Sequence, residues 1–443
     1  MRSPRTTRRR VLAGTAITLA GSLLLAACSG GTPNDSSDTD RADGSEKVTL
    51  KLWTWSNEAR VALQGGVLDL FTEQHPNIAV DILVQPDKDY QTLLTTGLSG
   101  SGGPDIAAIR SYGVISSFAE GGNLAPLDDV ITDWSGFSDI ALQGVTARND
   151  GKIYGVPQGM QTAQVYYNKK VFSDLKLDVP TTWDEFLEVS EKIKASGTAP
   201  IVIPGAVAGQ IALAGEVLGN ARRGGNGWTD EFVAGEKKLT DADSVASIEL
   251  MDEIQPYLID NVTSVTLDEA VTIFATGMAA MYPSGTWQVA SFASLGAKDL
   301  DYGTFDVPVD KGWPSAKPVT VAYSDGGWAL SARSENPEEA ATLLNWLSSA
   351  EYFQAYANAM GTIPPRDGVT LENAHVSEMY ERYLDNSSTY LGLAYLRYGT
   401  PWGTDVYGEQ VQKLWLDQQD AAGAAAEIQK GIDAWFDPAD FAG

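Results

Sequence analysis

Two runs of alternating hydrophobic and polar residues, 48–53 and 78–84, enclose a segment with helical spacing. Alternation predicts strands, because successive side chains of a strand point to opposite faces of a sheet. Between the two runs, apolar residues recur on one helix face: Leu63, Val67, Leu70 and Phe71. Strand, helix and strand in this order indicate a βαβ unit, so we expect a mostly parallel sheet.

Later segments extend this pattern to an α/β architecture with helices on both faces of the sheet. A helix is expected over 90–98, followed by a short buried strand over 105–109. Thr182 and Glu185 have the spacing of a capping box that opens another helix. From about 370 onward the pattern is predominantly helical.

The first 27 residues carry a different pattern, with a basic start and no acidic residue. Five arginines precede an uncharged stretch, Val11 to Ala27, which is too short and too rich in Gly, Ala and Thr to span a membrane comfortably. We expect residues 1–27 to be an export signal peptide that is removed. The run Thr7-Arg8-Arg9-Arg10-Val11-Leu12 resembles a twin-arginine export signal, and both that route and the general secretory route stay open.

The only cysteine, Cys28, closes the tetrapeptide Leu25-Ala26-Ala27-Cys28 directly after the apolar stretch. This arrangement resembles a lipobox, the processing site of bacterial lipoproteins. The resemblance implies cleavage before Cys28, fatty chains such as palmitate on the new terminus, and anchoring on the outer face of the cell membrane. The alternative is a buried structural cysteine, but residues 1–47 offer no surroundings in which it could be buried.

Residues 28–47 hold no large apolar side chain and are predicted to be a disordered tether. The full chain has 31 basic and 58 acidic residues, a net charge of −27. Because the leader holds five arginines and no acid, the mature chain has 26 basic and 58 acidic residues, a net charge of −32. Such a charge repels phosphate backbones and argues against a nucleic-acid partner.

Eight short motifs follow one another along the globular part of the chain. They are Leu52-Trp53-Thr54-Trp55, Gly103-Pro104-Asp105-Ile106, Gly122-Asn123-Leu124-Ala125-Pro126-Leu127, Tyr154-Gly155-Val156-Pro157 leading to Tyr166-Tyr167-Asn168-Lys169, Pro180-Thr181-Thr182-Trp183-Asp184-Glu185-Phe186, Ala279-Ala280-Met281-Tyr282-Pro283-Ser284-Gly285-Thr286-Trp287, Gly326-Gly327-Trp328 and Gly361-Thr362-Ile363-Pro364. In this order they resemble family 1 of the extracellular solute-binding proteins, the sugar-capturing receptors of ABC importers.

The resemblance implies a two-lobed periplasmic-binding-protein-like α/β fold, with a cleft between the lobes and a hinge that the chain crosses three times. Lobe one would take 48–158 plus 326–363, and lobe two 159–325 plus 364–443. The resemblance further implies a monomer that captures a neutral sugar or oligosaccharide and delivers it unaltered to a membrane permease. No cofactor is required for that task.

Ligands of open α/β sheets lie beyond the carboxyl ends of the strands, so the turns after the first and third strands should face the cleft. These turns hold Trp55, Asn57, Glu58, Arg110, Ser111 and Tyr112. The resemblance adds Gln161, Trp287, Asp325, Gly326 and Trp328, with Trp402 as a late contributor. A sugar offers apolar CH faces for aromatic rings and hydroxyls for planar polar groups. Each tryptophan also has a competing role in the core, because Trp is mostly buried in folded proteins.

A catalytic function has little support in the sequence, and we predict that the protein is not an enzyme. The two histidines, His75 and His375, lack a second His or Cys at metal spacing, and neither a G-x-S-x-G elbow nor a P-loop is present. A secreted glycoside hydrolase stays open, because the 58 carboxylates could include a catalytic pair. A receptor of the same fold for a polyamine or iron ligand also stays open.

Overall fold

The computed structural model describes residues 47–297 and 300–441. The predicted signal peptide, Cys28 and nearly all of the predicted tether therefore lie outside the described residues. Within the described part, no helix combines the length and the apolar character that crossing a membrane requires.

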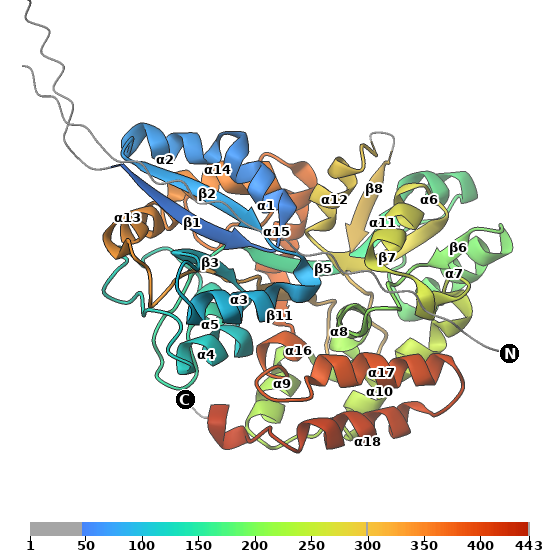
Figure 1. Ribbon diagram of the computed structural model, residues 1–443. Helices are drawn as coiled ribbons and strands as arrows, with labels where there is room; N and C mark the ends of the chain where they lie inside the picture. Colours follow the sequence, from blue (N-terminus) through green and yellow to red (C-terminus); the bar gives the residue numbers. More distant parts are fainter. Residues whose placement is uncertain (1–46, 298–299, 442–443) are drawn as a thin grey trace, which may run out of the picture. The chain divides into compact units, whose positions relative to one another are not determined.

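A mixed five-stranded sheet is built mainly from the first third of the chain (Figure 1). β1 (Val48–Thr54) pairs in parallel with β2 (Ile78–Val84) along its whole length and with β3 (Ile106–Ile109) on its other side. β10 (Gly327–Leu330) lies between β3 and β4 (Val156–Pro157) and is antiparallel to both. The predicted βαβ unit is confirmed by the parallel pairing of β1 with β2.

Helices on this sheet supply its core. The connection from β1 to β2 is α1 (Asn57–Ala62), a wide π turn η1 (Leu63–Val67) and α2 (Leu68–Gln74), so the predicted single helix is interrupted. The other helices around this sheet are α3 (Tyr90–Ser99), α4 (Gly113–Glu120), α5 (Asp139–Val145), α13 (Pro337–Leu347) and α14 (Ala350–Met360). Phe71, Trp328 and Tyr352 are buried together in this core.

The second sheet has the strand order β11-β9-β5-β7-β6, with β8 also paired to β5. Its strands are β5 (Met160–Asn168), β6 (Ala199–Ile201), β7 (Ala279–Gly285), β8 (Tyr302–Phe305), β9 (Thr320–Ser324) and β11 (Ser387–Thr389). In the first sheet the predicted parallel direction is found for β2, β1 and β3, and β10 is the exception. The second sheet is different, because β5 is antiparallel to β7, β8 and β9. In the first sheet, β10 begins beside the end of β3, with Gly327 opposite Ile109, and therefore runs against it.

The second sheet is covered by α6 (Lys169–Leu175), α7 (Trp183–Ala195), α8 (Ala208–Arg223), α9 (Gly225–Val233), α10 (Ala242–Glu253), α11 (Leu267–Ala275) and α12 (Gln288–Ser294). Thr182 caps α7 by accepting a hydrogen bond from the Glu185 backbone N–H at 3.2 Å. The Glu185 carboxylate reaches back to the N–H of Thr181 rather than of Thr182, so only half of the predicted capping box forms.

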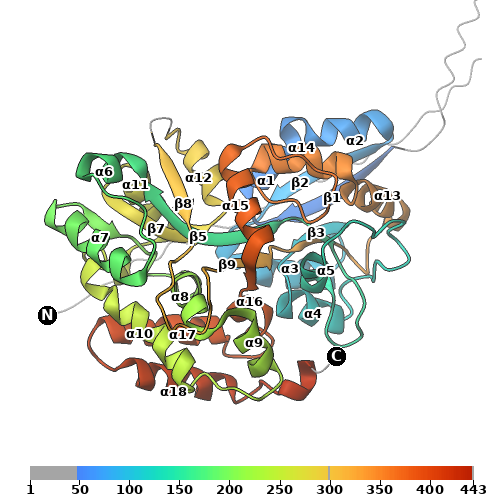
Figure 2. The ribbon, with the colours of Figure 1, turned by 180° about the vertical axis from the view of Figure 1, so that it is seen from behind.

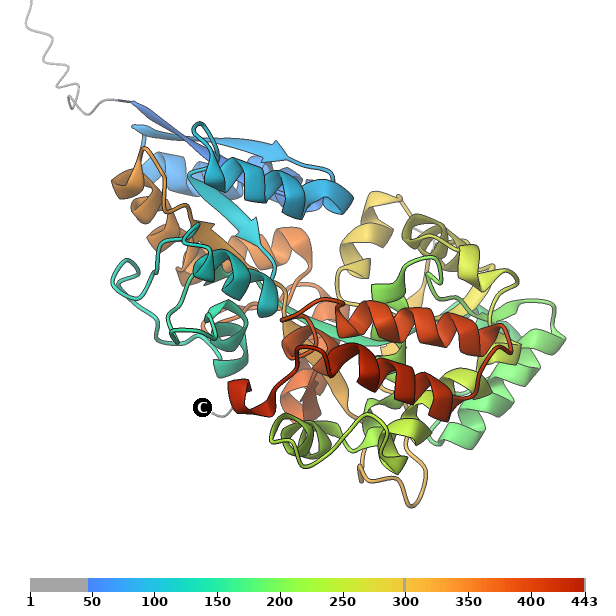
Figure 3. The same cartoon turned by 60° about the horizontal axis from the view of Figure 1, so that its bottom comes forward.

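The last part of the chain is helical, as predicted. α15 (Ala374–Asn386) lies across β5, β8 and β9 (Figure 2). After β11 come α16 (Leu391–Ala394), α17 (Gly403–Trp415) and α18 (Ala421–Ile432). α17 and α18 run side by side and pack on α8 and α10 (Figure 3).

The chain passes between the two sheets at 158–159, from β4 to β5, and again at 325–326, from β9 to β10. A third passage follows α14, where Ile363 forms a bridge with Met160 of β5. The division of the chain into two lobes at residues 158/159, 325/326 and 363/364 stays a prediction.

Candidate functional site

A cavity of about 260 Å³ lies at the carboxyl end of β3, beside the start of α3. Its wall on that side includes Asp87, Tyr90 and Arg110. Arg397 and Trp402, from the segment between α16 and α17, also line it. Its volume is slightly below the usual range for small-molecule pockets, about 300–1,000 Å³.

Arg110 is held in place on its wall by a ring and a carboxylate. Its guanidinium lies 4.5 Å from the centre of the Trp55 ring, and its Nη2 donates to Asp87 Oδ1. Trp55 in turn meets Tyr90 edge-on, with ring centres 5.3 Å apart. The Tyr90 hydroxyl donates to the backbone oxygen of Ala108 at 2.7 Å. Trp55 therefore supports Arg110 from behind, and Arg110 itself faces the cavity.

A second arginine–tryptophan pair completes the cavity. The Arg397 guanidinium lies 4.8 Å from the centre of the Trp402 ring, and its Nε donates to Thr404 Oγ1 at 3.0 Å. Among the described residues, no carboxylate lies within ion-pair distance of Arg397. Burial lowers the pKa of Arg397 and the like charge of Arg110 adds to this effect, while Tyr390 and the Asp405 carboxylate oppose it. Among the described residues, the terminal nitrogens of Arg397 donate to no protein acceptor, so their N–H groups are available to a ligand in the cavity.

Sequence reasoning missed Arg397, because it follows neither a predicted strand nor a recognised motif. Its one signal is the neighbouring Gly399-Thr400-Pro401-Trp402-Gly403 turn, which brings an aromatic residue and an arginine into one short segment.

At the second passage between the sheets, Gln161 and Asp325 pair with each other. Gln161 Nε2 donates to Asp325 Oδ2 at 2.9 Å, while Gln161 Oε1 is buried without a hydrogen-bond partner in the described part of the chain. Burial raises the pKa of Asp325, and the bond from Gln161 and the charge of Arg110 oppose this increase.

Gly326 brings this passage against the first sheet. Its φ of 148° is unfavourable for other residues, and a Cβ there would stand 2.4 Å from the Ile109 backbone oxygen and 3.4 Å from the Trp55 ring. The structure thus gathers Trp55, Arg110, Asp325 and Gly326 at one place, although they are far apart in sequence.

Ser111 and Tyr112 connect the turn after β3 to β9. Ser111 Oγ donates to the backbone oxygen of Ser324 at 2.6 Å, and the Tyr112 hydroxyl accepts from the Ser324 N–H at 3.1 Å. Tyr112 is fully buried against side chains of the second sheet. Both residues hold the hinge region together, and neither lines the cavity.

The remaining predicted residues lie elsewhere. Asn57 and Glu58 are exposed in the first turn of α1, where Asn57 Oδ1 accepts from Arg60 Nη2 at 2.8 Å. Trp287 is half-buried at the start of α12 and does not line this cavity. Trp328 is fully buried, and its Nε1 donates to the Tyr352 hydroxyl at 3.0 Å, so it packs in the core of the first sheet.

In the described part of the chain, no group of three or more His, Cys, Asp or Glu side chains is placed to hold a metal ion. His375 stacks on Tyr302 with ring centres 4.1 Å apart, away from the cavity.

Comparison with known proteins gives the family. The model for bacterial extracellular solute-binding proteins matches residues 55–352. The multiple sugar-binding protein of Streptococcus mutans is 24% identical over 433 residues, covering 94% of this chain and 95% of the relative. The diacetylchitobiose binding protein DasA of Streptomyces coelicolor is 28% identical over 376 residues, which cover 82% of this chain and 83% of the relative.

Solved structures agree on the fold. A chitin oligosaccharide binding protein superposes with a TM-score of 0.74 at 22% identity, covering 88% of this chain and 98% of its own. The solute-binding protein RafE, in complex with raffinose, gives a TM-score of 0.71 at 23% identity, covering 88% and 99%. With its two sheets, the passages between them and a cavity lined from both sides, the chain belongs to the bacterial extracellular solute-binding proteins and has their two-lobed, periplasmic-binding-protein-like α/β fold.

Proposed function

We propose that this protein is the substrate-binding component of an ABC importer, that it captures a sugar or oligosaccharide in the cavity between Arg110 and Arg397, and that it passes the ligand unaltered to a membrane permease. The observation that carries the proposal is the cavity's pair of arginine–tryptophan contacts, one on each wall. Family membership and the names of the relatives support the same conclusion.

The chemistry of the walls suits a saccharide. The indole of Trp402 offers an apolar surface to the CH face of a sugar ring, and guanidinium groups donate to hydroxyl oxygens in a fixed plane. A few polar groups among aromatic side chains are typical of small-molecule sites. The relatives are binding proteins, which favours this reading over the glycoside hydrolase alternative.

The two walls belong to different sheets, and this division suggests how binding is signalled. Arg110 follows β3 of the first sheet, whereas Trp402 belongs to the segment that follows β11 of the second. Only a form with both walls close together contacts the ligand from two sides. Ligand therefore shifts the population toward that closed form, which the permease would recognise.

We place Arg110 and Trp402 in the lining of the proposed site and add Arg397. Trp55 supports Arg110 without lining the cavity, and a role of Gln161, Asp325 and Gly326 in ligand binding stays a prediction, because they do not line it either. Ser111 and Tyr112 act at the hinge, and Trp328 is assigned to the core. Asn57, Glu58 and Trp287 lie outside the cavity, and a role for them in holding a longer ligand stays a prediction.

We also propose that the mature protein begins at Cys28, carries a lipid there, and acts as a monomer on the extracytoplasmic face of the cell membrane. Residues 28–47 would then link the lipid to the globular part. The basic leader and the Leu25-Ala26-Ala27-Cys28 sequence support this proposal.

A thermal-shift screen tests the function. The chain without residues 1–28 is heated with raffinose, diacetylchitobiose, maltotriose, spermidine or an iron chelate. A ligand at 100 times its dissociation constant stabilises the folded state by about 2.7 kcal/mol, which is readily measured. Stabilisation by a saccharide that is recovered intact after prolonged incubation is expected. Stabilisation only by spermidine or iron, or cleavage of the saccharide, would contradict the proposal.

A further inference from the structure

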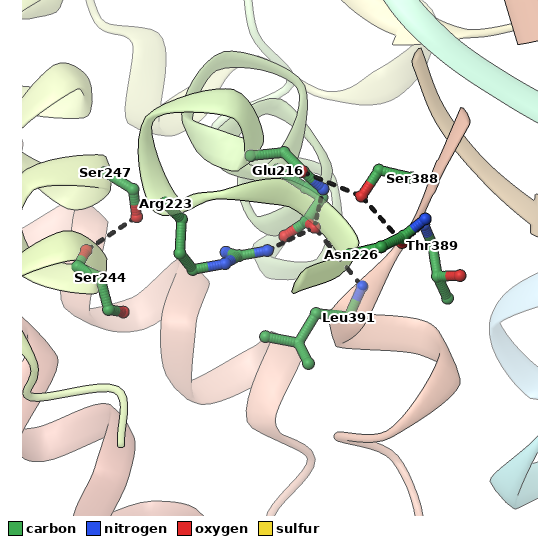
Figure 4. A network of polar contacts seen from close by, with 9 residues as sticks. Glu216, Arg223, Asn226, Ser244, Ser247, Ser388, Thr389 and Leu391 are labelled. Carbon is green, nitrogen blue, oxygen red and sulfur yellow. Dashed lines mark hydrogen bonds and ion pairs between the residues drawn. The ribbon is translucent and has the colours of Figure 1, made fainter. Parts of the chain in front are cut away.

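A polar cluster, buried except for Asn226, lies beside the segment that carries Arg397 and Trp402, and the ligand cavity does not include it (Figure 4). We call it the α8 cluster. Its members are Glu216, Asn220 and Arg223 of α8, Asn226 of α9 and Ser388 of β11.

Within α8, the carboxylate of Glu216 gathers two donors. Its Oε1 accepts from Asn220 Nδ2 and from Arg223 Nη2, each at 2.7 Å. The spacing of four and seven residues places all three side chains on one helix face. Glu216 and Arg223 are each only 5% exposed.

The cluster is bonded to the chain that leads to the cavity. The Ser388 hydroxyl donates to Asn220 Oδ1 at 3.0 Å or Asn226 Oδ1 at 3.1 Å, and the Thr389 N–H donates to Asn226 Oδ1 at 2.8 Å. Asn226 Nδ2 donates to the Ser387 backbone oxygen at 3.1 Å. The Leu391 N–H reaches Glu216 Oε1 at 3.5 Å. These bonds fix residues 387–391 against α8 and α9.

The other end of the same segment is also fixed against α8. A Cβ at Gly408 of α17 would stand 2.3 Å from the Ala208 backbone oxygen, so the two helices touch through their backbones there. Arg397 and Trp402 lie between these two attachments. Their position over the cavity therefore depends on how the segment is held at both ends.

Stability alone does not account for the charged members of the cluster. The desolvation of a buried ion pair offsets most of its Coulombic attraction, and well-packed apolar side chains often serve stability equally well. Directional bonds, in contrast, hold a segment in one register. We infer that Glu216 and Ser388 are positioning residues for the ligand site: through residues 387–391 they set the place of Arg397 and Trp402. This inference rests on the proposed function for its link to sugar binding.

Ser388→Ala is the sharpest test, because it removes one hydroxyl without leaving a buried charge. Ser247→Ala is its matched control. Ser247 is also buried and its hydroxyl also hydrogen-bonds, to the Ser244 backbone oxygen at 2.7 Å, but it does not contact residues 387–391 (Figure 4). Glu216→Gln is the second variant, since the amide keeps the shape and an acceptor for Asn220.

The first readout needs no ligand. The chain without residues 1–28 is labelled with fluorotryptophan, and the Trp402 fluorine resonance is assigned with Trp402→Phe. Ser388→Ala and Glu216→Gln should shift or broaden the Trp402 resonance and leave that of Trp328 in place. Ser247→Ala should leave both unchanged, even if its melting temperature falls as far. An unchanged Trp402 resonance in Ser388→Ala and Glu216→Gln would overturn the inference, whether or not the chain binds a sugar.

The second readout is affinity for whichever of raffinose, diacetylchitobiose and maltotriose binds most tightly. Ser388→Ala should weaken binding roughly three- to tenfold, the equivalent of one hydrogen bond's net contribution. In an Arg397→Ala, Trp402→Ala background the same change should have no further effect, because the positioned groups are gone. If Ser388→Ala lowered the affinity equally in the parent chain and in the double variant, Ser388 would not act through Arg397 and Trp402.

Discussion

The hydroxyl of Tyr112 accepts a hydrogen bond from the backbone N–H of Ser324, 3.1 Å away and 212 residues later in the chain. This bond joins the turn after β3 to the last residue of β9, directly before the passage at 325–326. Tyr112 has a φ of 59°, a backbone conformation that is uncommon for a bulky residue and costs of order 1–3 kcal/mol. A strained backbone of this kind persists only where the surrounding structure enforces it. The strained residue, Tyr112, belongs to the same turn after β3 as Arg110, which lines the ligand cavity.

Replacing Tyr112 by Phe should destabilise the protein, because the Ser324 N–H is left buried without its acceptor. We expect a loss of about 1–3 kcal/mol in the free energy of unfolding, measured by urea titration. Tyr390→Phe is the control, since the Tyr390 hydroxyl is equally buried but has no hydrogen-bond partner among the described residues. Equal losses in the two variants would show that the bond to Ser324 is unimportant.

Removing the aromatic wall should weaken sugar binding. Trp402→Ala is expected to raise the dissociation constant by about 1–3 kcal/mol in free-energy terms, as measured by calorimetry, because a large apolar surface at the ligand is lost. Trp313→Ala offers a comparison outside the cavity, where Arg222 lies 6.0 Å from the Trp313 ring centre. The site assignment fails if both variants bind the saccharide as the parent chain does.

Trp287 allows the extent of the site to be measured. It lies outside the cavity, so Trp287→Ala should leave the affinity for a short saccharide within about 0.5 kcal/mol of the parent value, the usual scatter of surface substitutions. A larger loss, with the melting temperature unchanged, would extend the ligand site to α12.

Gly326→Ala should be strongly destabilising. The φ of 148° is unfavourable for alanine, and its Cβ would stand 2.4 Å from the Ile109 backbone oxygen. We expect the free energy of unfolding to fall by more than the roughly 1–3 kcal/mol of a strained backbone alone. Gly227→Ala, inside α9 with nothing within 4 Å of the new Cβ, should instead stabilise the chain by about 0.5–1 kcal/mol. The melting temperatures of both variants test this prediction. A Gly326→Ala protein as stable as the parent chain would contradict the close contact between Gly326 and the Ile109 backbone oxygen.

Stability should fall in mild acid because of His375. Burial lowers the pKa of His375 below its ordinary 6.5, and Lys169 adds to this effect while Glu378 and Asp301 oppose it. The folded state thus binds fewer protons than the unfolded state between the lowered pKa and 6.5, so the contribution of His375 is present above 6.5 and is lost as the pH falls through the lowered pKa. As the pH falls from neutral to below the lowered pKa of His375, the free energy of unfolding should decrease less in His375→Gln than in the parent chain. Parallel pH profiles in chemical denaturation would speak against this assignment.

Much of the local structure could be predicted from the sequence. Hydrophobic and polar residues alternate in 48–53 and 78–84, as expected for a strand with one buried face. This pattern depends only on neighbouring residues, and β1 and β2 form at these positions. The helical last part of the chain follows from the same kind of local pattern. The interpretation of the leader and of Cys28 depends on the basic start, the apolar stretch and the lipobox resemblance, and the described residues do not include them.

The tertiary structure decided the direction of the strands and which side chains line the ligand cavity. β10 runs against β3 because the chain enters the sheet at its second passage, which no local period reveals. Trp328 and Trp402 are the same residue type near similar glycine-rich turns, yet one is buried beside Tyr352 and the other lines the cavity with Arg397. The difference arises from contacts between residues far apart in sequence, since burial depends on which elements meet. The sequence by itself thus determined the elements and the family resemblance, whereas the packing of distant segments determined which side chains face the ligand.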